Sequence, residues 1–186
     1  MNGAGHRSVA AATALTPAHT THAPAWQYPL TIGLAIATSA GTTSPDIDQT
    51  TGWRRLDRWL PDEALGAGGP LQHRGITHSW LLPLLALIAT HVLVPADTRW
   101  IAHAALVGWT SHLAADLVFG REGAGRGPGI PLLGWTRHVG CGLPVGGLLE
   151  RAVTAIAVPA TVAVLAWQGT GWAGLDHATT TLTRLV

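Results

Sequence analysis

The sequence predicts an all-α protein embedded in a membrane, and two observations support this fold class. Charged residues make up only 11% of the 186 residues and apolar residues 47%, whereas a soluble domain carries about 25% charged residues. The longest apolar stretches are rich in Ala and Leu and lack the strict polar–apolar alternation of a half-buried strand, so they favour helix. We therefore expect an integral membrane bundle of about four to five apolar helices.

Four segments are apolar enough to enter a bilayer, which a helix crosses in about 20 residues. In chain order they are residues 28–41, 80–95, 100–120 and 152–168. Two of them reach the required length comfortably and two are marginal. Trp residues lie at or near segment ends, as in an interfacial aromatic belt. The alternative is a soluble helical domain with very apolar core helices, and the low charge weighs against it.

The chain reads as one domain with a short tail. Residues 1–168 form the expected membrane-embedded domain, and the Thr-rich residues 169–186 form a polar C-terminal tail. Polar connections cover residues 16–27, 44–79 and 120–151. No internal repeat or domain boundary is visible.

The arginines predict an orientation. If the four segments alternate across the bilayer, the two long connections share one side and hold most of the basic residues. By the positive-inside rule that side faces the cytoplasm, which places the protein in the inner membrane. The net charge of +1 and the absence of an Arg-rich stripe exclude nucleic acid as an expected partner and leave the lipid bilayer. The eight arginines of these connections are Arg54, Arg55, Arg58, Arg74, Arg121, Arg126, Arg137 and Arg151.

Imidazoles and carboxylates gather beside the apolar segments. His-Arg-Gly-Ile-Thr-His-Ser spans residues 73–79, and Ser-Pro-Asp-Ile-Asp contains Asp46 and Asp48. His112 and Asp116 are spaced i, i+4, so on a helix they share one face with their Cβ atoms about 5–6 Å apart. Only ten acidic residues exist in the chain, and this mixture of nitrogen and oxygen donors suits a divalent metal.

Each motif also has a purely structural interpretation. Asp46 and Asp48 are typical of a helix N-cap and first turn. His112 and Asp116 could form only a hydrogen bond, although ionisable groups at membrane depth are usually functional. Arg74 could meet lipid headgroups, or its planar guanidinium could clamp a phosphate.

The order of these motifs resembles the YdjM-like family of membrane-bound metal-dependent hydrolases. The match runs from His6 through Pro-Asp-Ile-Asp, the His73–Ser79 block and His112-x-x-x-Asp116 to a late Glu150. That family is distantly similar to zinc-dependent phospholipase C and to fungal single-strand nucleases. The resemblance implies a helical fold, a site with two or three Zn²⁺ ions, and phosphoester hydrolysis. The implied metal ligands are His6, Asp46, Asp48, His73, His78, His112, Asp116 and Glu150.

We therefore expect a hydrolase with a polar metal site at the cytoplasmic face of the bundle. Its expected substrate is a phosphoester in a lipid or lipid-linked molecule, because the site lies at the membrane interface. Asp46 or Asp48 would accept a proton from the attacking water, and Arg74 would bind the phosphoryl oxygens. The alternatives are a membrane protein that binds metal without turnover and a transporter that conducts ions or protons along its His and Asp residues.

Overall fold

The computed structural model describes most of the chain as helix. The described residues are 3–20, 27–40, 44–49, 59–61, 64, 70–71, 74–119, 129–132 and 138–170. Its elements are α1 (Gly3–Thr20), α2 (Gln27–Ala40), the 3₁₀ helices η1 (Pro45–Gln49) and η2 (Ile76–His78), α5 (Leu81–Leu93), α6 (Arg99–Phe119), the strands β1 (Ile130–Pro131) and β2 (His138–Val139), and α7 (Leu148–Thr170).

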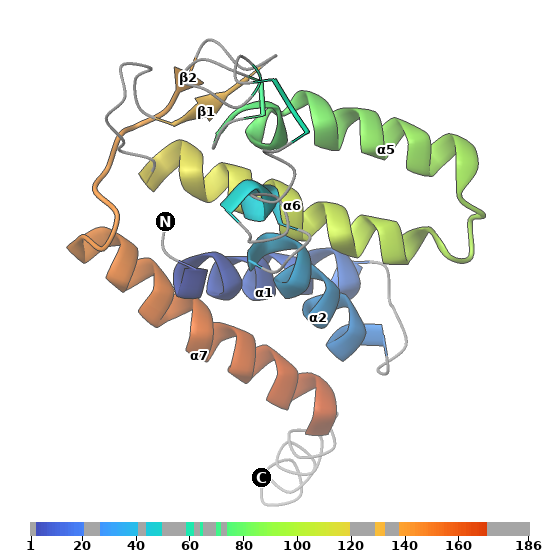
Figure 1. The fold of residues 1–186 in the computed structure, drawn as a ribbon. Coiled ribbons are helices and arrows are strands. Elements are labelled where there is room, and N and C mark those ends of the chain that lie inside the picture. Colours follow the sequence, from blue (N-terminus) through green and yellow to red (C-terminus); the bar gives the residue numbers. More distant parts are fainter. Residues whose placement is uncertain are drawn as a thin grey trace, which may run out of the picture.

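Helix α6 lies at the centre of the fold (Figure 1). On one side it packs against α1 and α2, and on the other it forms an antiparallel hairpin with α5. Helix α7 crosses beneath this group and packs against α1. The short helices η1 and η2 contact each other, η1 contacts α6, and the indole of Trp109 on α6 donates a hydrogen bond to η2, so both of the motif loops reach the central helix.

The helix boundaries follow from local chemistry. Pro29 and Pro83 fall in the first turns of α2 and α5, where a backbone N–H has no intrahelical partner to lose. Helix α5 ends two residues before Pro95, and proline disfavours helical geometry in the residue before it. The guanidinium of Arg99 then donates hydrogen bonds to the Val94 and His91 carbonyl oxygens at 2.8 and 3.0 Å, which satisfies the exposed end of α5.

Small residues allow α2 and α6 to approach closely. Ala10, Ala14 and Ala35 are fully buried in the cluster that joins α1 and α2. A Cβ atom placed on Gly108 of α6 would overlap the Ala35 carbonyl oxygen and the Thr38 hydroxyl. The same Thr38 hydroxyl donates to the Ala105 carbonyl oxygen at 2.9 Å. The backbones of α2 and α6 therefore touch at a point that only glycine permits.

This contact predicts a stability effect. Gly108→Ala should lower the free energy of unfolding by about 1–3 kcal/mol, since the inserted methyl group must push α2 away from α6. The matched control is Gly33→Ala on α2, where nothing lies within 4 Å of an added Cβ and helix propensity should add about 0.5–1 kcal/mol. Thermal unfolding of the detergent-purified proteins measures both. Equal stability of the two variants would contradict the close approach.

A short antiparallel hairpin closes the C-terminal end of α6. Ile130 pairs with Val139 and Pro131 with His138. The amides of Cys141 and Leu143 then donate to the carbonyl oxygens of Leu117 and Val118 at 2.8 and 3.1 Å, so the chain after β2 caps the last turn of α6. This hairpin lies within residues 120–151, which the sequence predicts only as a polar connection.

The predicted helical fold is confirmed, with corrections at the ends. Helices α2, α5 and α6 match their predicted segments to within two residues, and α7 begins four residues earlier than expected. The predicted loop over residues 16–27 is wrong in its first part, because α1 continues to Thr20. Helix α7 ends at Thr170. Among the residues that the structure describes, no helix combines the length and apolar character that crossing a membrane requires.

Candidate metal centre

Five polar side chains from four separate elements meet beside the middle of the fold. His6 comes from α1, Asp46 from η1, His78 from η2, and His112 and Asp116 from α6. Four of the five are buried, and the carboxylate of Asp46 is 33% exposed. Burying so many ionisable groups together is unfavourable unless they compensate one another or share a cation.

The distances between their donor atoms are those of ligands around a metal ion. The Nε2 atom of His78 lies 3.3 Å from Asp46 Oδ1 and 3.6 Å from Asp116 Oδ2. The Nε2 atom of His112 lies 3.7 and 3.6 Å from the same two oxygens. A good N–H···O bond is shorter, about 2.7–3.2 Å. Two ligands bound at about 2.0–2.1 Å in a tetrahedral site lie about 3.4 Å apart, so this spacing leaves room for an ion.

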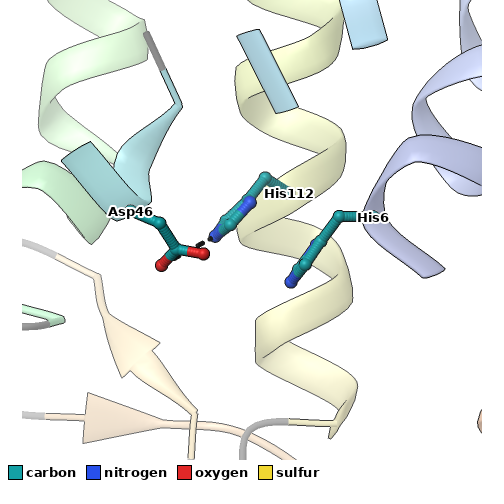
Figure 2. A group of neighbouring side chains, drawn as sticks. All are labelled: His6, Asp46 and His112. Atoms are coloured by element: carbon teal, nitrogen blue, oxygen red, sulfur yellow. Dashed lines mark ion pairs between the residues drawn. The ribbon is translucent and has the colours of Figure 1, made fainter. Parts of the chain in front are cut away.

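Figure 2 shows one of the two ligand groups, His6, Asp46 and His112. The rings of His6 and His112 stack with centroids 3.8 Å apart and planes 9° from parallel. The carboxylate of Asp46 approaches His112 from the other side (Figure 2). The second group contains His78, His112 and Asp116. His112 belongs to both, so the two groups form one continuous site in which adjacent metals could share ligands.

The His112 ring is held with one nitrogen toward the site. Its Nδ1 atom donates a hydrogen bond to the backbone carbonyl oxygen of Ser39, which leaves Nε2 as the atom with the lone pair. That Nε2 atom is buried and has no hydrogen-bond partner among the described residues. The Ser39 hydroxyl donates to the His6 carbonyl oxygen at 3.1 Å, so Ser39 supports both stacked histidines.

Two contacts position the second imidazole. The Thr77 hydroxyl lies 3.1 Å from His78 Nδ1, so the Nε2 atom of His78 faces the two carboxylates. The indole N–H of Trp109 donates to the Thr77 carbonyl oxygen at 3.3 Å, which attaches η2 to α6. The Ser79 hydroxyl accepts a hydrogen bond at 3.2 Å from the amide of Leu81, the first residue of α5.

Arg74 lies at the edge of the same site. Its Nε atom is 3.4 Å from Asp116 Oδ2, and the side chain is buried. Its φ of 59° is in the left-handed region, which is strained for a long side chain. His138 of β2 donates from Nε2 to the Arg74 carbonyl oxygen at 3.1 Å. The hairpin therefore helps to hold the strained backbone of Arg74, which places its guanidinium beside the Asp116 carboxylate. Backbone strain of this kind is often found at functional sites.

The electrostatics favour a neutral imidazole at His6. Burial lowers the pKa of His6 below its ordinary value and the neighbouring His112 lowers it further, while Asp116 opposes both. Stacked rings cannot both be protonated without strong repulsion. Neutral imidazole is also the form that binds a metal, so the donor set fits a borderline divalent cation such as Zn²⁺.

The structure brings together most of the predicted ligands. Asp48 lies in η1 directly after Ile47, but its side chain is outside the described part of the structure, as is all of His73. Glu150 is buried at the start of α7, where its carboxylate accepts a hydrogen bond from the Gly146 amide at 2.8 Å. That contact resembles a helix cap. Among the described residues, Glu150 belongs to neither ligand group, and its role as a ligand stays a prediction.

Sequence reasoning missed Ser39 and His138. Ser39 orients His112 through a backbone carbonyl, which any residue could supply, so no residue type signals it. His138 acts through the backbone of Arg74, and only the β-hairpin brings it there. Two further histidines, His91 on α5 and His103 on α6, lie outside the candidate metal centre. His91 is exposed, and the Nε2 atom of half-buried His103 has no hydrogen-bond partner within the described residues.

Comparison with known proteins gives one match. The model of a family described as YdjM inner membrane protein matches residues 1–183. No curated protein and no solved structure matches the chain. The family match spans every described element and all the residues of the candidate metal centre.

Proposed function

Since the chain belongs to the YdjM inner membrane protein family, we propose that it is a membrane-bound hydrolase that uses Zn²⁺ to cleave a phosphoester in a lipid or lipid-linked substrate. The observation that carries this proposal is the convergence of His78, His112, Asp46 and Asp116 at ligand-to-ligand distances. The reaction class, phosphoester hydrolysis, comes from the resemblance of the motif order to the YdjM-like metal-dependent hydrolases.

Each residue has a role in the proposed reaction. A bound divalent metal lowers the pKa of a coordinated water to about 7 and polarises phosphoryl oxygens. His78, His112 and Asp116 would hold one ion, and His6 and His112 would contribute to a neighbouring one, with Asp46 beside it. Asp46, assisted by Asp48, accepts the proton of the attacking water. Arg74 binds a non-bridging phosphoryl oxygen and stabilises the charge that develops there.

Access to the site favours a hydrolase over a purely structural metal site. Structural zinc sites are closed by four protein ligands, whereas catalytic sites keep a position open. His6, His78, His112 and Asp116 are nearly inaccessible, yet the Asp46 carboxylate is one-third exposed. Solvent and substrate can therefore approach from the η1 side, where both proposed proton acceptors lie.

The proposed function is tested by activity and metal content together. Detergent-purified protein should contain zinc and hydrolyse members of a phosphodiester and phosphomonoester panel. A chelator should abolish hydrolysis, and added Zn²⁺ should restore it. Stoichiometric zinc without hydrolysis of any substrate would favour the non-catalytic metal-binding alternative.

We also propose that exposed apolar side chains hold the protein in the inner membrane. On α5, Val92 and Leu93 are 74% and 77% exposed, and on α7, Leu148 and Ile156 are 86% and 68% exposed. Each such side chain gains about 1.5–3 kcal/mol on leaving water, and large exposed apolar patches mark membrane or protein contacts. Alkaline carbonate extraction of membranes should leave the protein in the pellet. Release into the supernatant as a monodisperse protein would contradict membrane embedding.

Cys141 offers a test of the proposed orientation without any substitution. It is the single cysteine of the chain, it is exposed, and it lies in the connection predicted to face the cytoplasm. A membrane-impermeant maleimide should label it in inverted inner-membrane vesicles and not in spheroplasts. The reverse pattern would place the metal centre on the opposite face.

A further inference from the structure

An apolar groove runs between α5 and α6, and none of the residues that line it belongs to the candidate metal centre. It has a volume of about 500 Å³, within the range of about 300–1,000 Å³ that is typical of small-molecule sites. Leu84 and Leu87 line it from α5, and Leu106 and Val107 line it from α6. These four side chains offer no hydrogen-bond donor or acceptor, so a hydrocarbon suits this part of the groove best.

One end of the groove is formed by residues that lie two positions in the sequence from ligands of the candidate metal centre. Trp80 and Thr110 form this end. Trp80 follows the ligand His78 by two residues, and the Trp109 indole joins α6 to the neighbouring Thr77. Thr110 and His112 point to different sides of α6, about 200° apart around the helix. The groove and the metal centre therefore lie on different sides of α6, and the chain from His78 to Trp80 connects them at the N-terminal end of α5.

The other end of the groove is polar. His91 and His103 line it, with ring centroids 5.3 Å apart, and the Nε2 atom of His103 is buried without a hydrogen-bond partner among the described residues. From Trp80 to His91 the groove follows α5 for about 16 Å, at about 1.5 Å per residue. One leaflet of a bilayer core is about 15 Å thick, so the apolar part is as long as one lipid chain.

We propose that this groove binds the hydrocarbon chain of the lipid substrate whose phosphoester lies at the metal centre. This inference rests on the proposed function and narrows its substrate class to phosphoesters with a long alkyl or acyl chain. The imidazoles of His91 and His103 limit the chain, because a longer one would have to cover polar nitrogens. The kcat/KM should therefore rise with the length of the hydrocarbon chain and then level off.

Two phosphodiesters that differ only in chain length test the groove. Ethyl and dodecyl 4-nitrophenyl phosphate share one reacting group, and each methylene buried is worth roughly a fourfold gain in binding. The protein should therefore prefer the dodecyl ester by at least about 100-fold in kcat/KM, and a hexadecyl ester should gain little more.

Matched variants separate the groove from the general membrane surface. Leu87→Trp fills the groove, whereas Leu85→Trp adds the same bulk to an exposed leucine of α5 outside it. Leu87→Trp should lower kcat/KM for the dodecyl ester at least about 10-fold and leave the ethyl ester unchanged, and Leu85→Trp should change neither. Dodecyl phosphate with a terminal diazirine should cross-link to Leu87 and Leu106 in the wild type and lose the Leu106 site in Leu87→Trp.

The outcomes distinguish the groove from the hydrolase. If both esters are hydrolysed equally and cross-links spread evenly over the exposed faces of α5 and α7, the groove proposal is overturned while hydrolysis stands. If neither ester is hydrolysed but cross-links still concentrate at Leu87 and Leu106, chain binding stands and the proposed function fails. Equal effects of the two Trp variants would also overturn the groove proposal.

Discussion

Replacing His112 with alanine should remove both metal and activity. Among the described residues, His112 is shared by the two ligand groups, so its loss removes a ligand from both. We expect metal affinity to fall by more than about 100-fold, which exceeds the usual effect of mutating a residue that only hydrogen-bonds to a metal ligand. We expect the rate of hydrolysis to fall at least about 1,000-fold. Elemental analysis after dialysis and a phosphodiester assay measure the two effects.

The Asp116→Ala variant should behave in the same way, and the double variant should be little worse than either. Residues that act as one unit give strongly non-additive effects. His103→Ala is the matched control for metal content, because His103 is a half-buried histidine of the same helix that belongs to neither ligand group in the described residues. Full metal content in His112→Ala and Asp116→Ala would reject the shared site and favour the ion-path alternative.

Replacing Arg74 with glycine should separate substrate binding from metal binding. Glycine adopts a φ of 59° without the strain that arginine bears there, so the fold and the His138 contact to the backbone should persist. Loss of the guanidinium removes the phosphate clamp. We expect hydrolysis to fall about 100-fold to 1,000-fold, the usual cost of removing one donor that stabilises the transition state, with metal content unchanged.

The comparison variant is Arg74→Lys, which keeps the charge but loses the planar fork and should recover only part of the activity. Thermal unfolding provides the structural control, since Arg74→Gly should be no less stable than the wild type with metal bound. If Arg74→Gly loses its zinc or unfolds at a much lower temperature, Arg74 is a structural partner of Asp116 and the phosphate-clamp role is wrong.

The fold was predictable where hydrophobicity alone decides it. The apolar runs that became α2, α5 and α6 are long enough to identify from composition, and their boundaries follow from Pro29, Pro83 and Pro95. Helix α1 was harder, because it mixes alanine with polar residues and is stabilised by packing against α2 and α7. The β-hairpin has strands of two residues each, too short for any alternating pattern to reveal.

The candidate site was predictable as a set of residue types and not as a geometry. The spacing of His112 and Asp116 places both on one face of a helix, and the structure confirms that they are neighbours. Nothing in the sequence specifies that α1 returns beside α6 so that His6 stacks on His112. Likewise, the capping role of Glu150 depends on a turn at Gly146, a contact that the resemblance to a metal-dependent family does not specify.

Anomalous diffraction at the zinc absorption edge, from crystals of the zinc-loaded protein, tests the central claim most directly. A peak is expected about 2.0–2.1 Å from His112 Nε2, the usual zinc–imidazole bond length, between the carboxylate oxygens of Asp46 and Asp116. A second peak within about 3.5–4 Å would identify a two-metal hydrolytic site. Zinc bound only elsewhere, with His112 and Asp116 joined to each other by a direct hydrogen bond, would contradict the metal centre and the function built on it.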